Sequence, residues 1–280
     1  MNLVDIFKYQ YEAILVGLFI SVSAVLVSPF LVLNKQSMIA DGMSHASFLG
    51  FIIALLFMNE PIYIALIITA VFSVILRFII RNTNIEGDSA IGIISSVAFS
   101  IGLIIISKKN FNVSVDSLIE GNLLAAKNFD VIVSGIVLTV TALFVTIYYR
   151  QLLSTTFDEE YTKFNKINGS LLGYIISILV SVLIVVSVRQ VGALLTSSLI
   201  ILPTTIATQF KKNFSKTLII SLLASISSFI IAFFISILFD LNPGPVIVVT
   251  EATILILSIL FVKIKSSIVR KSKGQIKNLF

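Results

Sequence analysis

Nine apolar stretches of about 20 residues each follow one another along the chain, separated by short polar breaks. A helix needs about 20 mostly apolar residues to cross the hydrocarbon core of a bilayer. The pattern therefore predicts an all-α fold, a polytopic transmembrane helical bundle. If the region around the short break at Arg189-Gln190 is divided differently, the count becomes eight. The nine predicted spans are 12–33, 38–58, 61–80, 88–107, 130–149, 170–188, 190–210, 215–239 and 244–262.

The composition excludes a soluble enzyme. Hydrophobic residues make up 57% of the 280 residues and charged residues 12%, whereas a soluble domain carries about 25% charged residues. The chain has no cysteine, so it forms no disulfide and offers no thiolate ligand. Its single histidine cannot supply a three-histidine metal site within one chain. The start of the sequence lacks a basic segment before the apolar run, so we expect the first stretch to be a true span and not a cleaved leader.

The distribution of positive charge predicts the orientation. With nine spans, fifteen lysine and arginine residues lie on the side of the C-terminus and five on the other side. The side rich in positive charge faces the cytoplasm, so the C-terminus is predicted inside and the N-terminus outside; with eight spans the N-terminus moves inside. This asymmetry accounts for the net charge of +6 without a nucleic-acid partner. The basic tail, 263–280, is expected to lie against anionic membrane lipid.

We expect a single transmembrane domain over 1–280, with two longer loops. The outer loop, 108–129, contains an apolar piece, 117–126, that suits a short interfacial or re-entrant helix. The cytoplasmic loop, 150–169, is the most polar stretch before the tail. Within it, Asp158 is suited to open a short helix that Gly169 closes. The acidic run Phe157, Asp158, Glu159 and Glu160 suits either a docking helix or a solvated loop.

The main candidate site is Asp41 with His45, at the start of the second stretch. A spacing of four residues places both side chains on one helix face. Ionisable residues within a span are costly and usually functional. Carboxylate and imidazole together suit a borderline divalent ion such as zinc, or manganese and iron. Two ligands do not complete a tetrahedral shell, so backbone, water, another helix or a second chain would supply the rest. The alternative interpretation is a structural Asp–His pair.

Other polar residues near the predicted membrane allow a structural and a functional interpretation. Asp88, or Ser89 after it, suits a helix N-cap. Ser197 and Ser198, followed by Pro203 as a kink, favour close helix packing, although they would also suit a polar pathway. Glu251 lies inside the last span, where it is either a buried partner of another polar residue or a second metal ligand.

The sequence lacks the motifs that would make it an enzyme. No Gly-Lys dipeptide is present, so there is no phosphate loop of the G-x-x-x-x-G-K-[ST] type, and we expect ATP to be hydrolysed by another subunit, if at all. The nucleophile motif G-x-S-x-G is also absent. No permanently bound cofactor is predicted; a metal ion would be cargo.

An ordered set of short motifs resembles the permease subunit of bacterial zinc/manganese ABC uptake transporters. Each motif is weak alone, but together they cover about residues 12–262 in the order of that family. They are Lys35-Gln36-Ser37 leading into Asp41-Gly42-Met43-Ser44-His45-Ala46, then Ala90-Ile91-Gly92-Ile93, Glu120-Gly121-Asn122-Leu123, Thr156-Phe157-Asp158-Glu159, Val191-Gly192-Ala193-Leu194-Leu195 with Leu202-Pro203, and Asn242-Pro243-Gly244.

This resemblance implies a metal-ion ABC importer permease fold in the bacterial cell membrane. It implies a second permease copy, most simply a homodimer, a cytoplasmic ABC ATPase subunit, and an extracellular metal-binding protein that delivers Zn²⁺ or Mn²⁺. The metal-path residues of the family correspond to Asp41 and His45, and the ATPase-coupling loop to the segment from Phe157 to Gly169. Glu120-Gly121 departs from the family's usual aromatic-Gly pair. Residues 36–38 and 192–195, followed by 212–214, look more like the zinc branch.

A rival interpretation also uses Asp41 and His45. In a proton-coupled secondary metal transporter or channel, the same pair would act as a proton relay. In the ABC interpretation, metal affinity falls in acid, because a protonated imidazole cannot bind a metal ion.

Overall fold

The computed structural model describes residues 10–34, 36–57, 62–108, 121, 123–157, 162, 164 and 168–277, without the side chains of Leu194 and 266–277. Helices dominate these residues, and the described part of the chain contains no strand. The elements are α2 (Tyr11–Leu33), α3 (Ile39–Phe57), α4 (Ile62–Asn82), α5 (Gly87–Lys108), the 3-10 helix η1 (Leu123–Ala125), α7 (Asn128–Phe157), α9 (Gly169–Val191), α10 (Ala193–Gln209), α11 (Phe214–Phe239) and α12 (Pro243–Lys277).

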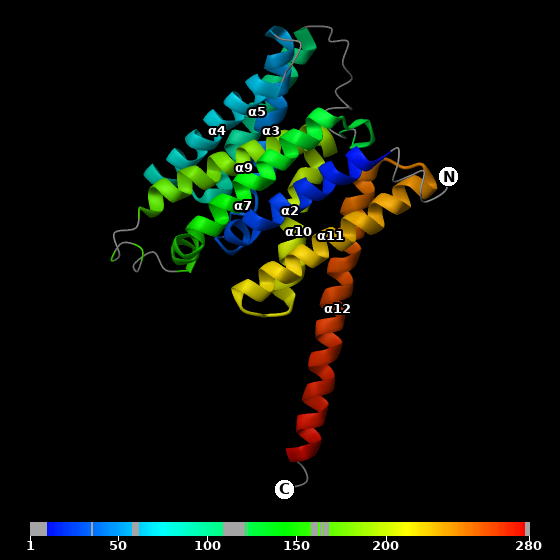
Figure 1. Cartoon of the computed structure of the whole chain (residues 1–280). Coiled ribbons are helices and arrows are strands. Elements are labelled where there is room, and N and C mark those ends of the chain that lie inside the picture. The colour runs from blue at the N-terminus through cyan, green and yellow to red at the C-terminus, as the bar shows by residue number, and fades with distance from the viewer. Residues whose placement is uncertain are drawn as a thin grey trace.

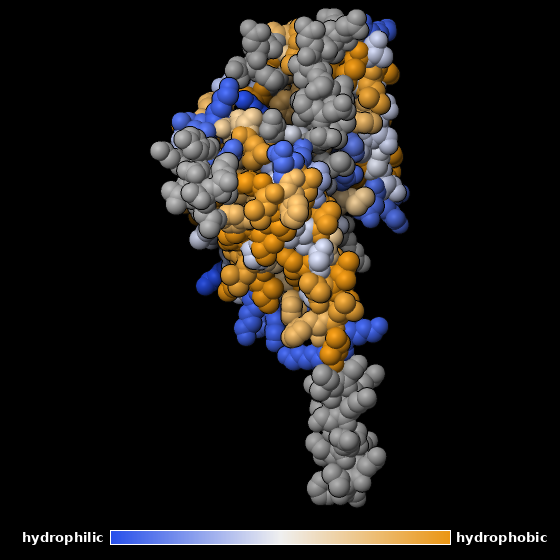
Figure 2. Space-filling model, turned by 90° about the vertical axis from the view of Figure 1, so that its right-hand side faces the viewer, coloured by the Kyte–Doolittle hydropathy of each residue, from blue (hydrophilic) through white to orange (hydrophobic). Residues whose placement is uncertain are grey.

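The helices confirm the predicted transmembrane bundle. In the described part of the chain, eight helices are long and apolar enough to cross a membrane, and α10, with 17 residues, is a shorter ninth helix. Hydrophobic side chains cover the middle of the face on which α12 lies, and hydrophilic ones border them (Figure 2). Such a surface suits a hydrocarbon environment, because an aqueous surface of this extent would not expose so many large apolar side chains.

Helix α3 is the most buried of the described spans. It contacts α4, α5, α9 and α10, while α2 lies between α7, α11 and α10 (Figure 1). Close approach of α3 to α4 depends on Gly50, because a β-carbon at this position would lie 2.9 Å from the Ala65 Cα atom and 3.1 Å from its carbonyl oxygen. Small residues that bring backbones together are the usual contact between membrane helices.

Several predicted boundaries differ from the structure. The predicted break at Arg189-Gln190 is wrong by two residues: α9 continues to Val191, and the chain turns at Gly192, which has a φ of 85°. Only glycine adopts this backbone conformation readily. Helix α7 also extends eight residues beyond its predicted end, into the segment assigned to the inner loop. The C-terminal tail continues α12 as helix through Lys277 and extends away from the other helices (Figure 1).

The two predicted loop helices fall largely outside the described residues. In the outer loop, 117–120 and 122 lie outside them, and the described part forms η1 at Leu123–Ala125. In the inner loop, Gly169 was predicted to close a short helix. This prediction is wrong, because Gly169 is the first residue of α9. The Asn168 side chain accepts a hydrogen bond from the Leu171 backbone N–H, 3.1 Å away, and this cap explains why α9 begins there.

We predict that Gly50→Ala destabilises the bundle by about 1–3 kcal/mol, the usual cost of overpacking, because the Ala65 backbone cannot move aside as a side chain would. Thermal unfolding of the detergent-purified protein measures the change. Gly92→Ala is the matched control, since no atom lies within 4 Å of the β-carbon it would add. Equal stability of the two variants would contradict the close α3–α4 contact.

Candidate metal site on helix α3

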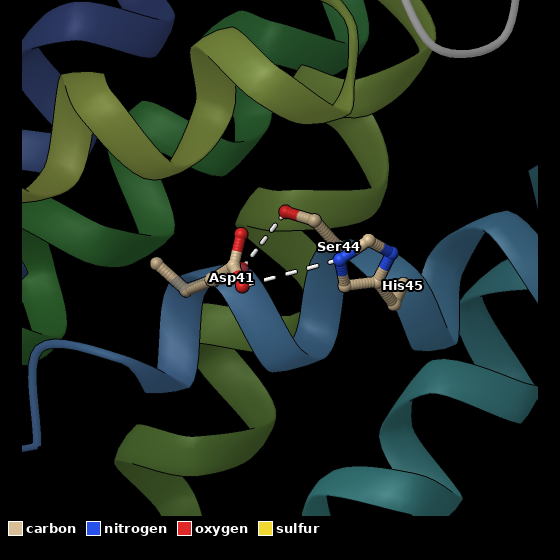
Figure 3. Close-up of polar contacts among 4 residues, drawn as sticks. Asp41, Ser44 and His45 are labelled. Carbon is tan, nitrogen blue, oxygen red and sulfur yellow. Dashed lines mark hydrogen bonds and ion pairs between the residues drawn. The ribbon is translucent and has the colours of Figure 1, made fainter. Parts of the chain in front are cut away.

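Asp41 and His45 lie on consecutive turns at the start of α3. Asp41 is in the first helical turn, where the exposed backbone N–H groups favour a negative charge. Most of the remaining side chains of α3 are buried, so the two ionisable groups stand at one edge of a helix that is otherwise enclosed. Their shared face was predicted from the spacing, and the structure places the two side chains on the same side of α3 (Figure 3).

The geometry of the pair leaves room for an ion between the two groups. The His45 Nε2 atom lies 3.9 Å from the Asp41 Oδ2 atom, which is too long for a hydrogen bond. Two ligands about 2.0–2.2 Å from a tetrahedral zinc ion are separated by roughly 3.3–3.6 Å. A small side-chain rotation would therefore bring both atoms to a common ion. The Asp41 and His45 side chains are 45% and 31% exposed, so an ion could reach them.

The neighbouring helix α5 holds the imidazole in place. The rings of His45 and Phe99 meet edge to face with centroids 5.0 Å apart, and Phe99 also contacts Phe48 at 5.3 Å. Next to Asp41, Gly42 allows Ile91 of α5 to approach α3. Ser44 does not extend this site, because its hydroxyl donates to the Ala40 carbonyl oxygen at 2.8 Å (Figure 3). The packing thus fixes His45 from the α5 side.

In the described part of the chain, Asp41 and His45 are two potential ligands without a third beside them. Within the described part of the structure, no group of three or more His, Asp or Glu side chains lies close enough to hold a metal ion. The pair is therefore incomplete as a coordination shell.

The predicted role of Asp88 as an N-cap is not what the structure shows. Helix α5 begins at Gly87, and the Ala90 backbone N–H donates to the Glu86 carbonyl oxygen at 3.0 Å. Glu86 therefore occupies the cap position, and Asp88 lies in the first turn with an exposed side chain. Its charge still suits this end of the helix, and nothing brings it close to Asp41 or His45 in the described structure.

Of the residues singled out on α10, only Pro203 is fully buried, and both serines are half-buried. Ser198 donates to the Leu195 carbonyl oxygen at 2.8 Å, and Ser197 is half-buried. Pro203 is buried inside the helix. Next to it, the Ser28 hydroxyl of α2 contacts the Thr204 hydroxyl at 2.7 Å and also the Ile200 carbonyl oxygen. These bonds join α2 to α10 beside the proline, and the choice between a packing and a pathway role for Ser197 and Ser198 stays a prediction.

The predicted coupling loop is described in part, at 150–157, 162, 164 and 168–169. Phe157 is the last residue of α7; its exposed ring meets Phe214, at the start of α11, edge to face with centroids 6.2 Å apart. Asp158, Glu159 and Glu160 lie outside the described residues. Gly169 opens α9. The first end of the segment 157–169 thus contacts α11 through Phe157, and its other end leads directly into α9.

Glu251 is fully buried in α12, where its Oε1 atom accepts a hydrogen bond from Ser228 of α11 at 3.2 Å. Glu251 thus has a polar partner on another helix.

Two polar contacts between helices were not predicted. Arg77 of α4 donates to Gln36, in the turn that leads to α3, at 3.3 Å, and its guanidinium lies over Gly173 of α9. Arg189 pairs with Asp130 at 3.7 Å and lies 5.8 Å from the centre of the Phe129 ring. The charge rule accounted for Arg77 on the cytoplasmic side, whereas Arg189 fell among the five positive residues of the outer side, and nothing in the sequence pointed to its partner.

Comparison with known proteins agrees with this architecture. The model of the ABC 3 transport family matches residues 7–262. The chain belongs to the ABC 3 transport family. The solved structure of PsaBC from Streptococcus pneumoniae in complex with Fab has the same fold, with a TM-score of 0.81, 24% identity, and coverage of 94% of this chain and 98% of that one.

Curated relatives of this family member carry the names of different metal systems. The chain is 26% identical, over 90% of its length and 97% of the relative's, to the high-affinity zinc uptake system membrane protein ZnuB of Haemophilus influenzae. It is 27% identical to the manganese import system permease protein ScaB of Streptococcus gordonii, over 95% and 96%. It is also 27% identical to a probable iron transport system membrane protein of Haemophilus influenzae, over 92% and 96%.

We predict that Gly42→Ala reduces metal transport and that Ile91→Ala in the same chain restores it. An added β-carbon at Gly42 would lie 2.6 Å from the Ile91 Cγ2 atom. Because a β-branched side chain is stiff, we expect the clash to push α5, and Phe99 with it, away from His45. Removing the Ile91 methyl groups relieves the clash, a coupling expected only between residues in contact. Measuring uptake in the single and double variants tests this; a double variant no better than Gly42→Ala would contradict it.

Proposed function

We propose that the chain is the membrane-spanning permease of an ATP-driven importer of divalent metal ions, and that the ions pass Asp41 and His45. The main supporting observation is the Asp41–His45 geometry, a carboxylate and an imidazole 3.9 Å apart on the most buried helix of a membrane bundle. Its family membership and the names of its relatives, which are membrane proteins or permeases of metal transport systems, support the proposal. The chain is a transport subunit, with ATP hydrolysis in a separate partner.

Zinc is our first candidate ion and manganese the next. Imidazole with carboxylate serves zinc well, whereas oxygen-rich sites suit manganese. The identities to the zinc, manganese and iron relatives are nearly equal, so overall similarity does not discriminate among these ions. The preference for zinc rests on the motifs at 36–38 and 192–195 and on the imidazole of His45.

A second permease copy would complete the coordination shell. Two copies that bring their pairs together supply two carboxylates and two imidazoles, the four ligands of a tetrahedral site. The surface of α5 supports this pairing. Ser89, Ser96 and Ser100 lie on an exposed face of the helix, spaced seven and four residues apart, and small polar residues with such spacing are typical of contacts between membrane helices. We therefore propose a homodimer.

The remaining partners follow from the predicted orientation, with the C-terminus cytoplasmic and, if α10 counts as a span, the N-terminus outside. A cytoplasmic ABC ATPase dimer would engage the loop 150–169, and an extracellular metal-binding protein would deliver the ion. The basic part of α12 after Lys263 would contact anionic lipid.

In the proposed mechanism the ATPase drives alternating access. Closure of the ATPase dimer would move the loop between α7 and α9, and the contact of Phe157 with Phe214 would pass that movement to α11. Arg77, which contacts both Gln36 and the Gly173 region of α9, would link α9 to the turn before Asp41. Opening towards the cytoplasm would separate the ligands around the ion. The ion would then be bound more weakly and leave inward.

We predict that His45→Ala and Asp41→Asn each reduce metal uptake to the background level. Each variant removes one of the two proposed ligands of a chain. Alanine is a strong helix former, and asparagine has nearly the shape of aspartate, so α3 should remain intact. The measurement is uptake of radioactive zinc and manganese by cells that carry the permease with its ATPase and binding protein. Glu86→Gln, an exposed carboxylate outside the site, is the control and should transport normally.

The outcomes separate the competing interpretations. Zinc uptake that is lost in the variants supports both the site and the zinc assignment, whereas uptake of manganese alone moves the chain to the manganese branch. Normal uptake by either variant contradicts the site. Uptake by the purified permease without ATPase, driven by a proton gradient, would favour the proton-relay alternative.

We also predict that replacing Asp158 and Glu159 with alanine weakens association with the ATPase. These acidic residues belong to the proposed coupling loop and would face basic groups of the partner, where lost charge complementarity mainly slows association. Co-purification of ATPase with tagged permease measures the effect. Replacing Asp88 with alanine, at the start of α5, serves as a control; equal co-purification of both variants would contradict the docking role.

A further inference from the structure

Glu251 occupies the middle of the one buried stripe on α12. Gly244, Ile247, Glu251 and Ser258 recur at helical spacing and are buried, while large apolar residues on the other sides, such as Val249 and Leu257, are exposed. Figure 2 shows the hydrophobic surface on the side of the molecule where α12 lies. Glu251, with an exposed fraction of 0%, therefore points from a membrane helix into the protein and not towards lipid or water.

The carboxyl group is incompletely bonded, although Ser228 of α11 contacts it and Ser225 lies about one turn earlier on the same helix. The Ser228 hydroxyl lies 3.2 Å from the Glu251 Oε1 atom and 2.9 Å from the Ser225 carbonyl oxygen, and its one hydrogen serves both acceptors. The Glu251 Oε2 atom and the Ser225 hydroxyl are buried and have no hydrogen-bond partner among the described residues. The site therefore contains an acid oxygen and a hydroxyl whose bonding capacity is unused.

No positive charge faces the carboxyl group from the elements that pack against α12. These elements are α10, α11 and η1. Neither α10 nor η1 contains a charged residue, and the only one in α11 is Lys216, twelve positions before Ser228. On α12 itself, the next charged residue is Lys263, twelve positions after Glu251. The described structure records no ion pair of Glu251.

A carboxylate in this position would be an unpaired charge in an apolar medium, which is among the most costly arrangements in a membrane protein. Either a cation or a proton must neutralise it. A metal ion would find one carboxylate and two hydroxyls, with no further acidic or histidine side chain near enough in the described structure. A proton needs only the carboxyl group, and it turns the oxygen that carries it into a donor that a buried water can join to Ser225.

We propose that Glu251, with Ser225 and Ser228, forms a proton-binding site at the contact between α11 and α12, and that Glu251 carries its proton in the folded permease. The proton keeps this contact neutral. Because α10 contacts both α12 and α3, the site is one helix away from Asp41 and His45. The proposal does not depend on which metal the permease carries.

Infrared difference spectroscopy tests this directly. The full-length permease, purified with its ATPase in a detergent without ester groups, is measured at neutral pH as wild type and as Glu251→Gln. We expect the carbonyl stretch of a protonated carboxylic acid in the wild type, shifted in deuterium oxide and missing in Glu251→Gln. Glu86→Gln, which removes an exposed carboxylate, should leave this band unchanged. If the wild type lacks the carbonyl band of a protonated carboxylic acid, the proposal is overturned.

A second variant keeps the test decisive if Glu251→Gln does not assemble. Ser228→Ala removes the donor to the Glu251 Oε1 atom but leaves the acid in place. The carbonyl stretch should then persist and move to higher frequency, because a carbonyl that loses a hydrogen bond stiffens. A band that does not move would show that the protonated acid is not the group beside Ser228 and would likewise overturn the proposal.

Discussion

The burial of α3 among α4, α5, α9 and α10 is the constraint on which the other features depend. A carboxylate and an imidazole at membrane depth are tolerated only where protein or a water-filled path surrounds them. The four helices around α3 provide this protection, and Gly42 and Gly50 allow two of them to approach closely. The accessible edge of α3 carries Asp41 and His45. The helix is therefore enclosed along most of its length and open to an ion only near its start.

The same requirement explains how the other polar groups of the bundle are arranged. Most serine and threonine hydroxyls donate to carbonyl oxygens one turn earlier in their own helix, as Thr69 does to Ala65, and so need no partner elsewhere. Ser28 instead joins two helices beside Pro203. Arg189, in the last turn of α9, is paired with Asp130, which lowers the cost of placing a cation at a helix junction.

Much of the fold could be predicted from the sequence, because spans are set by the length of apolar runs. The exact ends of the helices could not be predicted where they depend on contacts with other helices or on the conformation of a single residue. Arg189-Gln190 looked like a polar break, but Asp130 pairs with the arginine, and the conformation of Gly192 decides where α9 ends. The spacing of Asp41 and His45 predicted their shared helix face, and their role in metal passage stays a proposal. The supporting contacts of Phe99, Ile91 and Arg77 come from other helices, and no periodicity reveals which faces will meet.

The most direct test of the central claim is X-ray absorption spectroscopy of the permease–ATPase complex loaded with zinc and, separately, with manganese. If two copies share one ion through Asp41 and His45, the complex binds one ion per two permease chains in this site. The spectrum then shows the scattering of two imidazoles together with oxygen ligands, and His45→Ala abolishes the imidazole signal. An ion bound without imidazole, or a spectrum unchanged in His45→Ala, would contradict the account.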